Sequence, residues 1–194
     1  MSQAPRIQPV QEPYSDDIAA MLAKWMPPGA EVEPLRLFRT LAVHEQLAGR
    51  MRPLGAGILG SRALVEPQLR EVMIARTCAL TGAAYEWGVH AVAFGRPLGL
   101  SDEQLRSTVH GGPDDPCWDE PQAAVMSLAD ELHHTNTIGA PLWERLGRLF
   151  DQAQVLELMV TCGYYHAIAY VCNGAAVQPE EWAEPFPPSG PTTC

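Results

Sequence analysis

Residues 67–94 have the sequence PQLREVMIARTCALTGAAYEWGVHAVAF, which contains two helical patterns separated by a break. Pro67 suits the first turn of a helix, and apolar residues then recur at the helical period as far as Leu80. The Thr81-Gly82 pair interrupts this pattern. A second helix is expected over residues 83–94, because Gly95-Arg96-Pro97 provides a stop directly after it. The stretch therefore predicts two consecutive helices.

Helical patterns continue on both sides of this stretch. Residues 35–51 carry apolar residues at helical spacing, and Pro53, with two glycines after it, is expected to end that helix. Ser101 is placed to cap a short helix, with Gln104 at the reciprocal capping-box position. Further helix-compatible patterns occupy residues 121–135, 140–150 and 151–177. No segment shows the strict alternation of a half-buried strand, so the predicted fold class is all-α.

Proline placement divides the 194-residue chain into three parts. Six of its 18 prolines precede residue 35 and five follow residue 178. Because proline disfavours helix interiors, both ends are expected to be extended rather than helical. The prediction is a Pro-rich N-terminal arm over 1–34, a helical domain over 35–178 and a Pro-rich tail over 179–194.

The composition excludes several classes of partner. Thirteen Lys and Arg residues against 23 Asp and Glu residues give a net charge of −10, which opposes binding to nucleic acid. Residues 158–179 carry no charged side chain, but polar residues dilute this stretch and favour a buried core helix over a membrane span. The N-terminus lacks the pattern of a signal peptide, so a cytoplasmic protein without a membrane partner is expected.

Neither a metal nor a cofactor is expected. The five cysteines form no CxxC pair, which is typical of free thiols. His133 and His134 lie near Glu131, but adjacent helical residues point about 100° apart and cannot easily share one metal ion. Phosphate-binding and dinucleotide-binding glycine motifs are lacking as well.

Glu86 and His90 are the strongest candidates for chemistry. They lie four residues apart, so one helix face would carry both side chains, and a carboxylate beside an imidazole can tune a general acid or base. A solvated surface pair is the alternative. Glu71, one helix earlier, either points into the same pocket or is solvated. His166 lies in the most apolar segment, where a hydrogen-bonded core histidine is favoured over a functional one.

Several motifs together resemble the carboxymuconolactone decarboxylase family, which includes the alkylhydroperoxidase D-like (AhpD-like) proteins. They span about residues 35–180 and comprise Leu69-Arg70-Glu71, the string from Ala79 to His90, Gly99-Leu100-Ser101-Asp102, and Gly163-Tyr164-Tyr165-His166 with Asn173. The resemblance implies an all-helical fold and a homo-oligomer, either dimer, trimer or hexamer. It also implies a pocket near the subunit interface.

The resemblance transfers only in part to a thiol peroxidase. Peroxidase-type members carry a glutamate, a CxxC pair and a histidine; Glu71 and His90 match the first and last, but Ala83 and Glu86 occupy the two cysteine positions. Disulfide cycling needs a low-pKa thiol and a resolving partner, which these residues do not supply. Cys78 on the preceding helix is the remaining thiol near this region.

We therefore expect the protein to carry an acid/base site that acts on an acidic small molecule. In this hypothesis His90 moves the proton, Glu86 tunes and orients it, and Glu71 completes the relay. Other residues assigned to substrate binding are Tyr85 and Trp87 as pocket walls, Arg70 or Arg76 as a carboxylate anchor, and His166.

Three functions remain open from the sequence. The favoured one is a cofactor-independent lyase or isomerase, resembling 4-carboxymuconolactone decarboxylase, that acts on a carboxylated lactone or an aromatic-derived acid. The others are an alkylhydroperoxidase-like oxidoreductase with a degenerate thiol site and a non-catalytic oligomeric binding protein.

Overall fold

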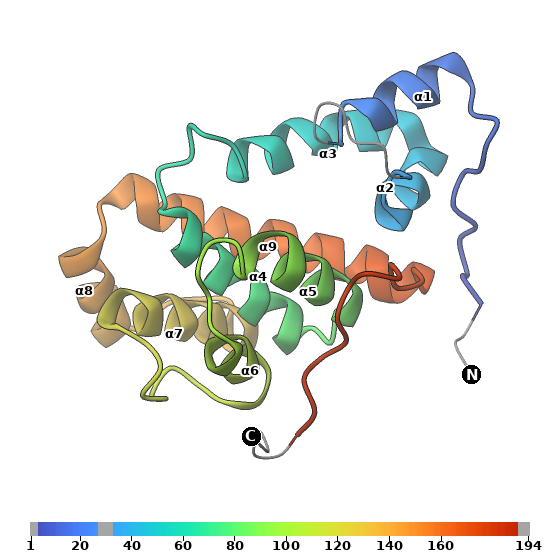
Figure 1. Cartoon of the computed structure of the whole chain (residues 1–194). Helices are drawn as coiled ribbons and strands as arrows, with labels where there is room; N and C mark the ends of the chain where they lie inside the picture. The colour runs from blue at the N-terminus through green and yellow to red at the C-terminus, as the bar shows by residue number, and fades with distance from the viewer. Residues whose placement is uncertain (1–3, 27–32, 190–194) are drawn as a thin grey trace.

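The structure, a computed structural model, describes residues 4–26 and 33–189, and every regular element in these ranges is helical (Figure 1). The prediction of an all-α fold is confirmed. The α-helices are α1 (Asp16–Ala23), α2 (Arg36–Leu41), α3 (Glu45–Ile58), α4 (Pro67–Leu80), α5 (Ala84–His90), α6 (Asp102–His110), α7 (Glu120–Thr135), α8 (Ala140–Leu149) and α9 (Gln152–Ala175).

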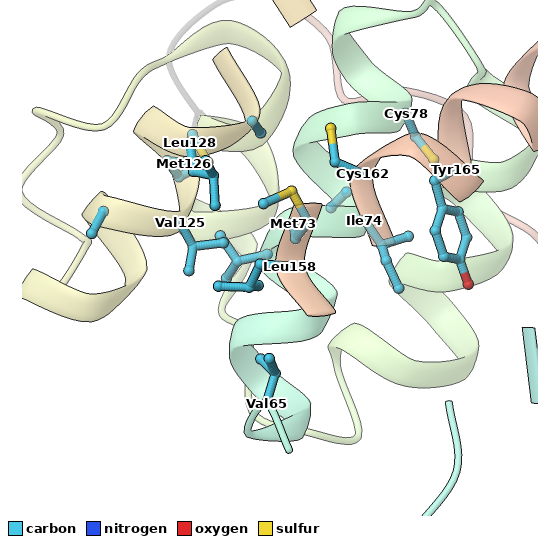
Figure 2. Packing of buried hydrophobic residues seen from close by; sticks show 14 of the residues in the cluster. Val65, Met73, Ile74, Cys78, Val125, Met126, Leu128, Leu158, Cys162 and Tyr165 are labelled. Atoms are coloured by element: carbon cyan, nitrogen blue, oxygen red, sulfur yellow. The ribbon is translucent and has the colours of Figure 1, made fainter. Parts of the chain in front are cut away.

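Helix α4 lies at the centre of the bundle and packs against α5, α6, α7 and α9. Figure 2 shows Met73 and Ile74 of α4 between side chains of α7 and α9, including Leu158. Nearly the whole circumference of α4 is buried, including its charged residues. Since buried charges are unfavourable without partners, the ionic side chains of α4 must each be paired within the fold.

The predicted helix boundaries around α4 and α6 are confirmed. Pro67 occupies the first turn of α4, and Gly82 ends the break after it with a φ of +66°, a conformation that glycine adopts without strain. Ser101 caps α6 and forms the complete capping box with Gln104. These caps fix the directions in which α4 and α5 leave their common turn.

The helix expected over residues 35–51 is divided differently. A short 3-10 turn over Ala42–His44 separates α2 from α3, and His44 caps α3 by accepting a hydrogen bond from the Leu47 N–H at 3.4 Å. Pro53 does not end α3, contrary to the prediction. The carbonyl freed by Pro53 belongs to Gly49, an exposed residue, so water can satisfy it.

Described segments near both ends of the chain pack on the helical bundle. Helix α1 forms within the predicted extended arm, capped by Ser15, and its Leu22 is buried. That expectation was wrong because the segment between Pro13 and Pro27 is free of proline and carries a helix cap. In the tail, Phe186 packs edge-on against Trp87 at 5.6 Å. The three-part domain division stays a prediction, and residues 1–3, 27–32 and 190–194 lie outside the described ranges.

Candidate active site

Glu71 and His90 form a short, buried ion pair between α4 and α5. Glu71 Oε2 lies 2.7 Å from His90 Nδ1, and both side chains are almost wholly buried. The second carboxylate oxygen of Glu71 accepts a hydrogen bond from Arg70 Nε at 3.2 Å. A proton on Nδ1 is therefore held toward Glu71, which fixes the orientation of the imidazole and leaves Nε2 as its working nitrogen.

Nε2 of His90 faces two further polar groups. The Tyr165 hydroxyl lies 3.1 Å away and Glu86 Oε1 lies 3.5 Å away, the latter through the predicted i,i+4 spacing. Phe94 stacks on the imidazole with ring centroids 4.9 Å apart. Phe94 belongs to a π-helical turn, Ala91–Gly95, that follows α5 directly, and such turns often occur at functional sites.

The charges of this cluster decide the protonation of His90. Burial alone lowers the pKa of the imidazole, but the negative charges and hydrogen bonds of Glu71 and Glu86 outweigh burial and raise the pKa to about 9. At neutral pH His90 is therefore an imidazolium. Together with Arg70 it balances the two carboxylates, which is why four ionisable groups can be buried here.

A cavity of about 600 Å³ opens onto this cluster, within the size range of small-molecule sites. His90, Glu86 and Tyr165 line it, whereas Glu71 lies behind His90 and does not. The other lining is largely apolar and aromatic, and it includes Trp25, Phe38, Phe94, Tyr164 and Trp182. The arrangement therefore presents a small polar cluster, which includes the imidazolium of His90, to a largely apolar space.

The structure brings together His90, Glu86 and Glu71, the three residues assigned to acid/base chemistry. The two glutamates, however, exchange the places expected of them relative to His90. Glu71 makes the short contact that orients His90, and Glu86 borders the cavity itself. Glu86 was expected to orient His90 because residues four positions apart are neighbours on one helix face. The closer partner comes from another helix, which spacing alone does not reveal.

Tyr85 and Trp87 do not line the cavity, although both were expected to be pocket walls. The Tyr85 hydroxyl donates to Glu180 at 2.6 Å and accepts from the Leu37 N–H at 3.1 Å. Trp87 Nε1 donates to Thr108 at 3.0 Å from within the core. Both side chains therefore serve the packing of α5.

Arg76 and His166 also lie away from the cavity. Arg76 forms a bidentate ion pair with Asp130, with N···O distances of 2.6 and 3.1 Å. His166 Nε2 lies 3.0 Å from His133 Nδ1, between α7 and α9. Arg70 contacts Glu71 and also does not line the cavity, so none of these three residues is placed to hold a substrate.

Sequence reasoning missed Tyr165 and three charged residues of the cavity, namely Lys24, Glu33 and Arg52. Tyr165 precedes His166 in a motif that was noted, but a step of one residue turns a helix by about 100°, and it is Tyr165 that faces His90. Arg52 donates through Nε to the Lys24 carbonyl at 2.9 Å, which ties α3 to the end of α1. No helical pattern links these two distant segments.

Cys78 is buried near the same cluster (Figure 2). Burial, followed by the negative charge of Glu86, raises the pKa of the Cys78 thiol well above its ordinary value. The thiol therefore stays protonated at neutral pH, which opposes a nucleophilic role. Among the described residues no group of three His, Cys, Asp or Glu side chains is placed to hold a metal ion.

Neither a family model nor a curated protein matches the sequence. Solved structures do match the fold. An uncharacterized peroxidase-related protein from Silicibacter sp. TM1040 has a TM-score of 0.78 at 14% identity, covering 92% of this chain and 94% of that one. A Cys-to-Ala variant of the debrominase Bmp8, in complex with 2,3,4-tribromopyrrole, has a TM-score of 0.73 at 12% identity, covering 94% and 95%.

A third match is a protein of unknown function from Agrobacterium tumefaciens, described as a candidate AhpD antioxidant defence protein. Its TM-score is 0.66 at 15% identity, covering 72% of this chain and 94% of that one. At such identities the likeness shows the fold alone. The chain thus has the AhpD-like fold that its motifs predicted.

Proposed function

We propose that this chain of AhpD-like fold is a proton-transfer enzyme that needs no cofactor. Its substrate is a small carboxylated lactone or an aromatic-derived acid, and it acts on that substrate either as a decarboxylating lyase or as an isomerase. The observation that carries the proposal is the position of His90. Its Nδ1 is held by Glu71 at 2.7 Å, and it borders an apolar cavity of about 600 Å³. A fixed imidazolium at such a surface suits general acid catalysis.

In a decarboxylation the residues would act as follows. The carboxylate leaves as CO2, and the electron pair of the broken C–C bond remains on the substrate as an enolate. His90 transfers the Nε2 proton to that carbon, and the neutral imidazole regains a proton from water. Glu71 keeps the ring in place throughout, while the Tyr165 hydroxyl, 3.1 Å from Nε2, holds the transferred proton in line before the step.

Arg52 and Lys24 supply the positive charge for an acidic substrate. Both line the cavity, whereas Arg70 and Arg76 do not. Within residues 4–26 and 33–189 the Arg52 guanidinium donates only through Nε, to the Lys24 carbonyl, and its other N–H groups suit a carboxylate. The aromatic lining fits a planar ring, and the debrominase of the same fold is described in complex with a small halogenated pyrrole.

The test is turnover of 4-carboxymuconolactone and related acidic lactones, followed by CO2 release and by lactone loss. His90→Gln is expected to lower kcat/KM at least about 100-fold while circular dichroism stays unchanged. His166→Gln is the matched control, because this histidine lies outside the cavity and should leave the rate intact.

Other outcomes separate the alternatives. A folded wild type that binds these acids without converting them favours the binding protein. Peroxide consumption that is lost in Cys78→Ser would favour the thiol oxidoreductase. Equal rates for wild type and His90→Gln would contradict the proposed role of the histidine.

A further inference from the structure

A second cavity, of about 400 Å³, lies between residues 5–11, helix α2 and the chain that follows α9. We call it the arm cavity, and its lining shares no residue with that of the His90 cavity. Backbone hydrogen bonds hold its walls together: the Val10 N–H donates to the Arg39 carbonyl at 3.1 Å, and the Arg6 N–H to the Ala175 carbonyl at 2.8 Å (Figure 1). The arm cavity is therefore part of the fold, and its volume is that of a small-molecule site.

Helix α2 separates the two cavities. Leu37 and Phe38 line the His90 cavity, whereas Arg36, Arg39 and Thr40 line the arm cavity. Positions three and four residues apart share one helix face, so both arginines belong to the same wall. The helix thus turns its apolar side to one cavity and its cationic side to the other.

The charge of the arm cavity stands out in this chain. Its other polar lining residues are Gln8, Gln11 and Gln178, and within the part of the chain that the structure describes no Asp or Glu lines it. The chain as a whole has a net charge of −10 and only 13 Lys and Arg residues. Two guanidinium groups without a carboxylate beside them in the lining favour an anion there.

Arg39 has unused hydrogen-bonding capacity. Its side chain is only 9% exposed, and Nη1 forms an ion pair with Glu33 at 2.5 Å. Its Nε is buried and has no hydrogen-bond partner within residues 4–26 and 33–189. A buried charged donor without an acceptor is unfavourable. Arg76 shows how such a group is satisfied elsewhere in this chain, because it holds both oxygens of Asp130 through Nε and Nη2.

Arg36 is also only partly neutralised by its neighbours. Its Nη1 donates to the Pro179 carbonyl, but its Nε lies 4.0 Å from the nearer Glu180 oxygen, beyond hydrogen-bond distance. The Glu180 carboxylate instead accepts from the Tyr85 hydroxyl and from the Arg36 backbone N–H, each at 2.6 Å. The Arg36 guanidinium therefore keeps N–H groups for a further acceptor.

From these observations we propose that the arm cavity is a binding site for a small oxyanion, a molecule whose carboxylate or phosphate group is held by Arg39 and Arg36. The Nε/Nη2 edge of Arg39 takes two oxygens of the anion, as Arg76 does with Asp130. Arg36 supplies the second positive charge. The side-chain amides of the glutamines suit a polar remainder of the ligand. The inference is independent of the proposed function, because the two cavities share no lining residue.

Calorimetric titration of the full chain with inorganic phosphate and with succinate, at constant ionic strength set by sodium chloride, tests the site. Saturable binding of at least one anion is expected, and the ratio of the two dissociation constants shows whether the ligand carries a phosphoryl or a carboxyl group. Arg39→Gln and Arg36→Gln should each raise the dissociation constant at least about tenfold. Arg39→Lys keeps the charge but loses the planar fork, and it should also weaken binding. Circular dichroism verifies that each variant is folded.

Three variants are the controls. Arg62→Gln removes an exposed arginine outside both cavities, and Arg52→Gln and His90→Gln alter only the His90 cavity, so all three should bind the anion as the wild type does. The absence of saturable binding, or an affinity that is unaffected at both Arg36 and Arg39, would overturn the proposal. So would a loss in Arg52→Gln, since the anion would then occupy the His90 cavity, or an equal loss in Arg62→Gln, which would indicate attraction by net charge alone.

Discussion

His90 keeps its proton because Glu71 and Glu86 outweigh the effect of burial on its pKa. The acid form of the imidazole carries the proposed reaction, so the rate should be constant at neutral pH and fall as the pH rises through about 9. Glu71→Gln removes the larger of the two favourable charges, and it should shift this fall to lower pH. The measurement is the pH profile of kcat.

An NMR titration of the imidazole is the control for that profile. It should place the His90 transition near pH 9 in the wild type and lower in Glu71→Gln. A rate that instead rises with pH through this range would mean that the neutral imidazole acts as a base.

Tyr165 is expected to matter through its hydroxyl alone. Tyr165→Phe keeps the ring but removes the oxygen that lies 3.1 Å from His90 Nε2, so the proton is held less well and kcat should fall roughly tenfold. The loss of one buried hydrogen bond lowers the free energy of unfolding by about 1 kcal/mol. Steady-state kinetics and urea unfolding measure the two effects.

Tyr85→Phe is the matched control for Tyr165→Phe. It also loses a buried hydroxyl, the one bonded to Glu180, but outside the cavity. Stability should fall with kcat unchanged. If both variants lose the same activity, Tyr165 is a packing residue.

The sequence predicted contacts between individual side chains only where both residues lie on one helix. The i,i+4 rule correctly placed Glu86 beside His90. For Glu71 the residues left a position in the pocket and a solvated one both open, because its 2.7 Å contact with His90 depends on how α4 and α5 cross. Tyr165 comes from α9, some 75 positions along the chain, and no local pattern reports such a partner.

Among the helices, α4 carries both the site and the structural ion pair of the core. Glu71 faces His90, while Arg76 reaches Asp130 on α7 and the carbonyls of Thr108 and Gly111. One helix thus orients His90 and joins α6 and α7. Loss of the ion pair between Arg76 and Asp130 should therefore lower the stability of the fold and leave the catalytic rate unchanged.

Arg76→Met is expected to lower the free energy of unfolding by about 2 kcal/mol, because Asp130 loses a charged, bidentate partner. kcat and KM should stay at wild-type values below the unfolding transition. Urea unfolding and steady-state kinetics are the measurements. A raised KM without loss of stability would restore Arg76 as a substrate anchor.

Helix ends were more predictable than helix continuity. Caps such as Ser101 with Gln104 are local hydrogen bonds, so their residues can be recognised directly. Pro53 inside α3 and the π-helical turn after His90 depend on solvent access and on neighbouring helices. A local sequence pattern reports neither solvent access nor the position of neighbouring helices.

Over the whole molecule, the cavity is closed by segments from both ends of the chain. Trp25 follows α1, Trp182 lies in the tail, and both line the same space as His90. Proline content suggested that these ends lie outside the domain, because proline density indicates only where helices are interrupted. Whether an extended segment packs on a bundle depends on the surface that the bundle offers.

Those two tryptophans give a direct test of where ligands bind. An aromatic carboxylate such as benzoate should change the tryptophan emission of the wild type, because Trp25 and Trp182 exchange solvent contact for ligand contact. Trp25→Phe and Trp182→Phe should each reduce the change, while Trp143→Phe, which replaces an exposed residue on α8 outside the cavity, should leave it intact. Arg52→Gln should weaken binding of benzoate but not of neutral benzyl alcohol, since only the former carries a charge for the guanidinium. An emission change that depends on Trp143 instead would mean that acids bind elsewhere and that the two ends of the chain do not enclose the binding site.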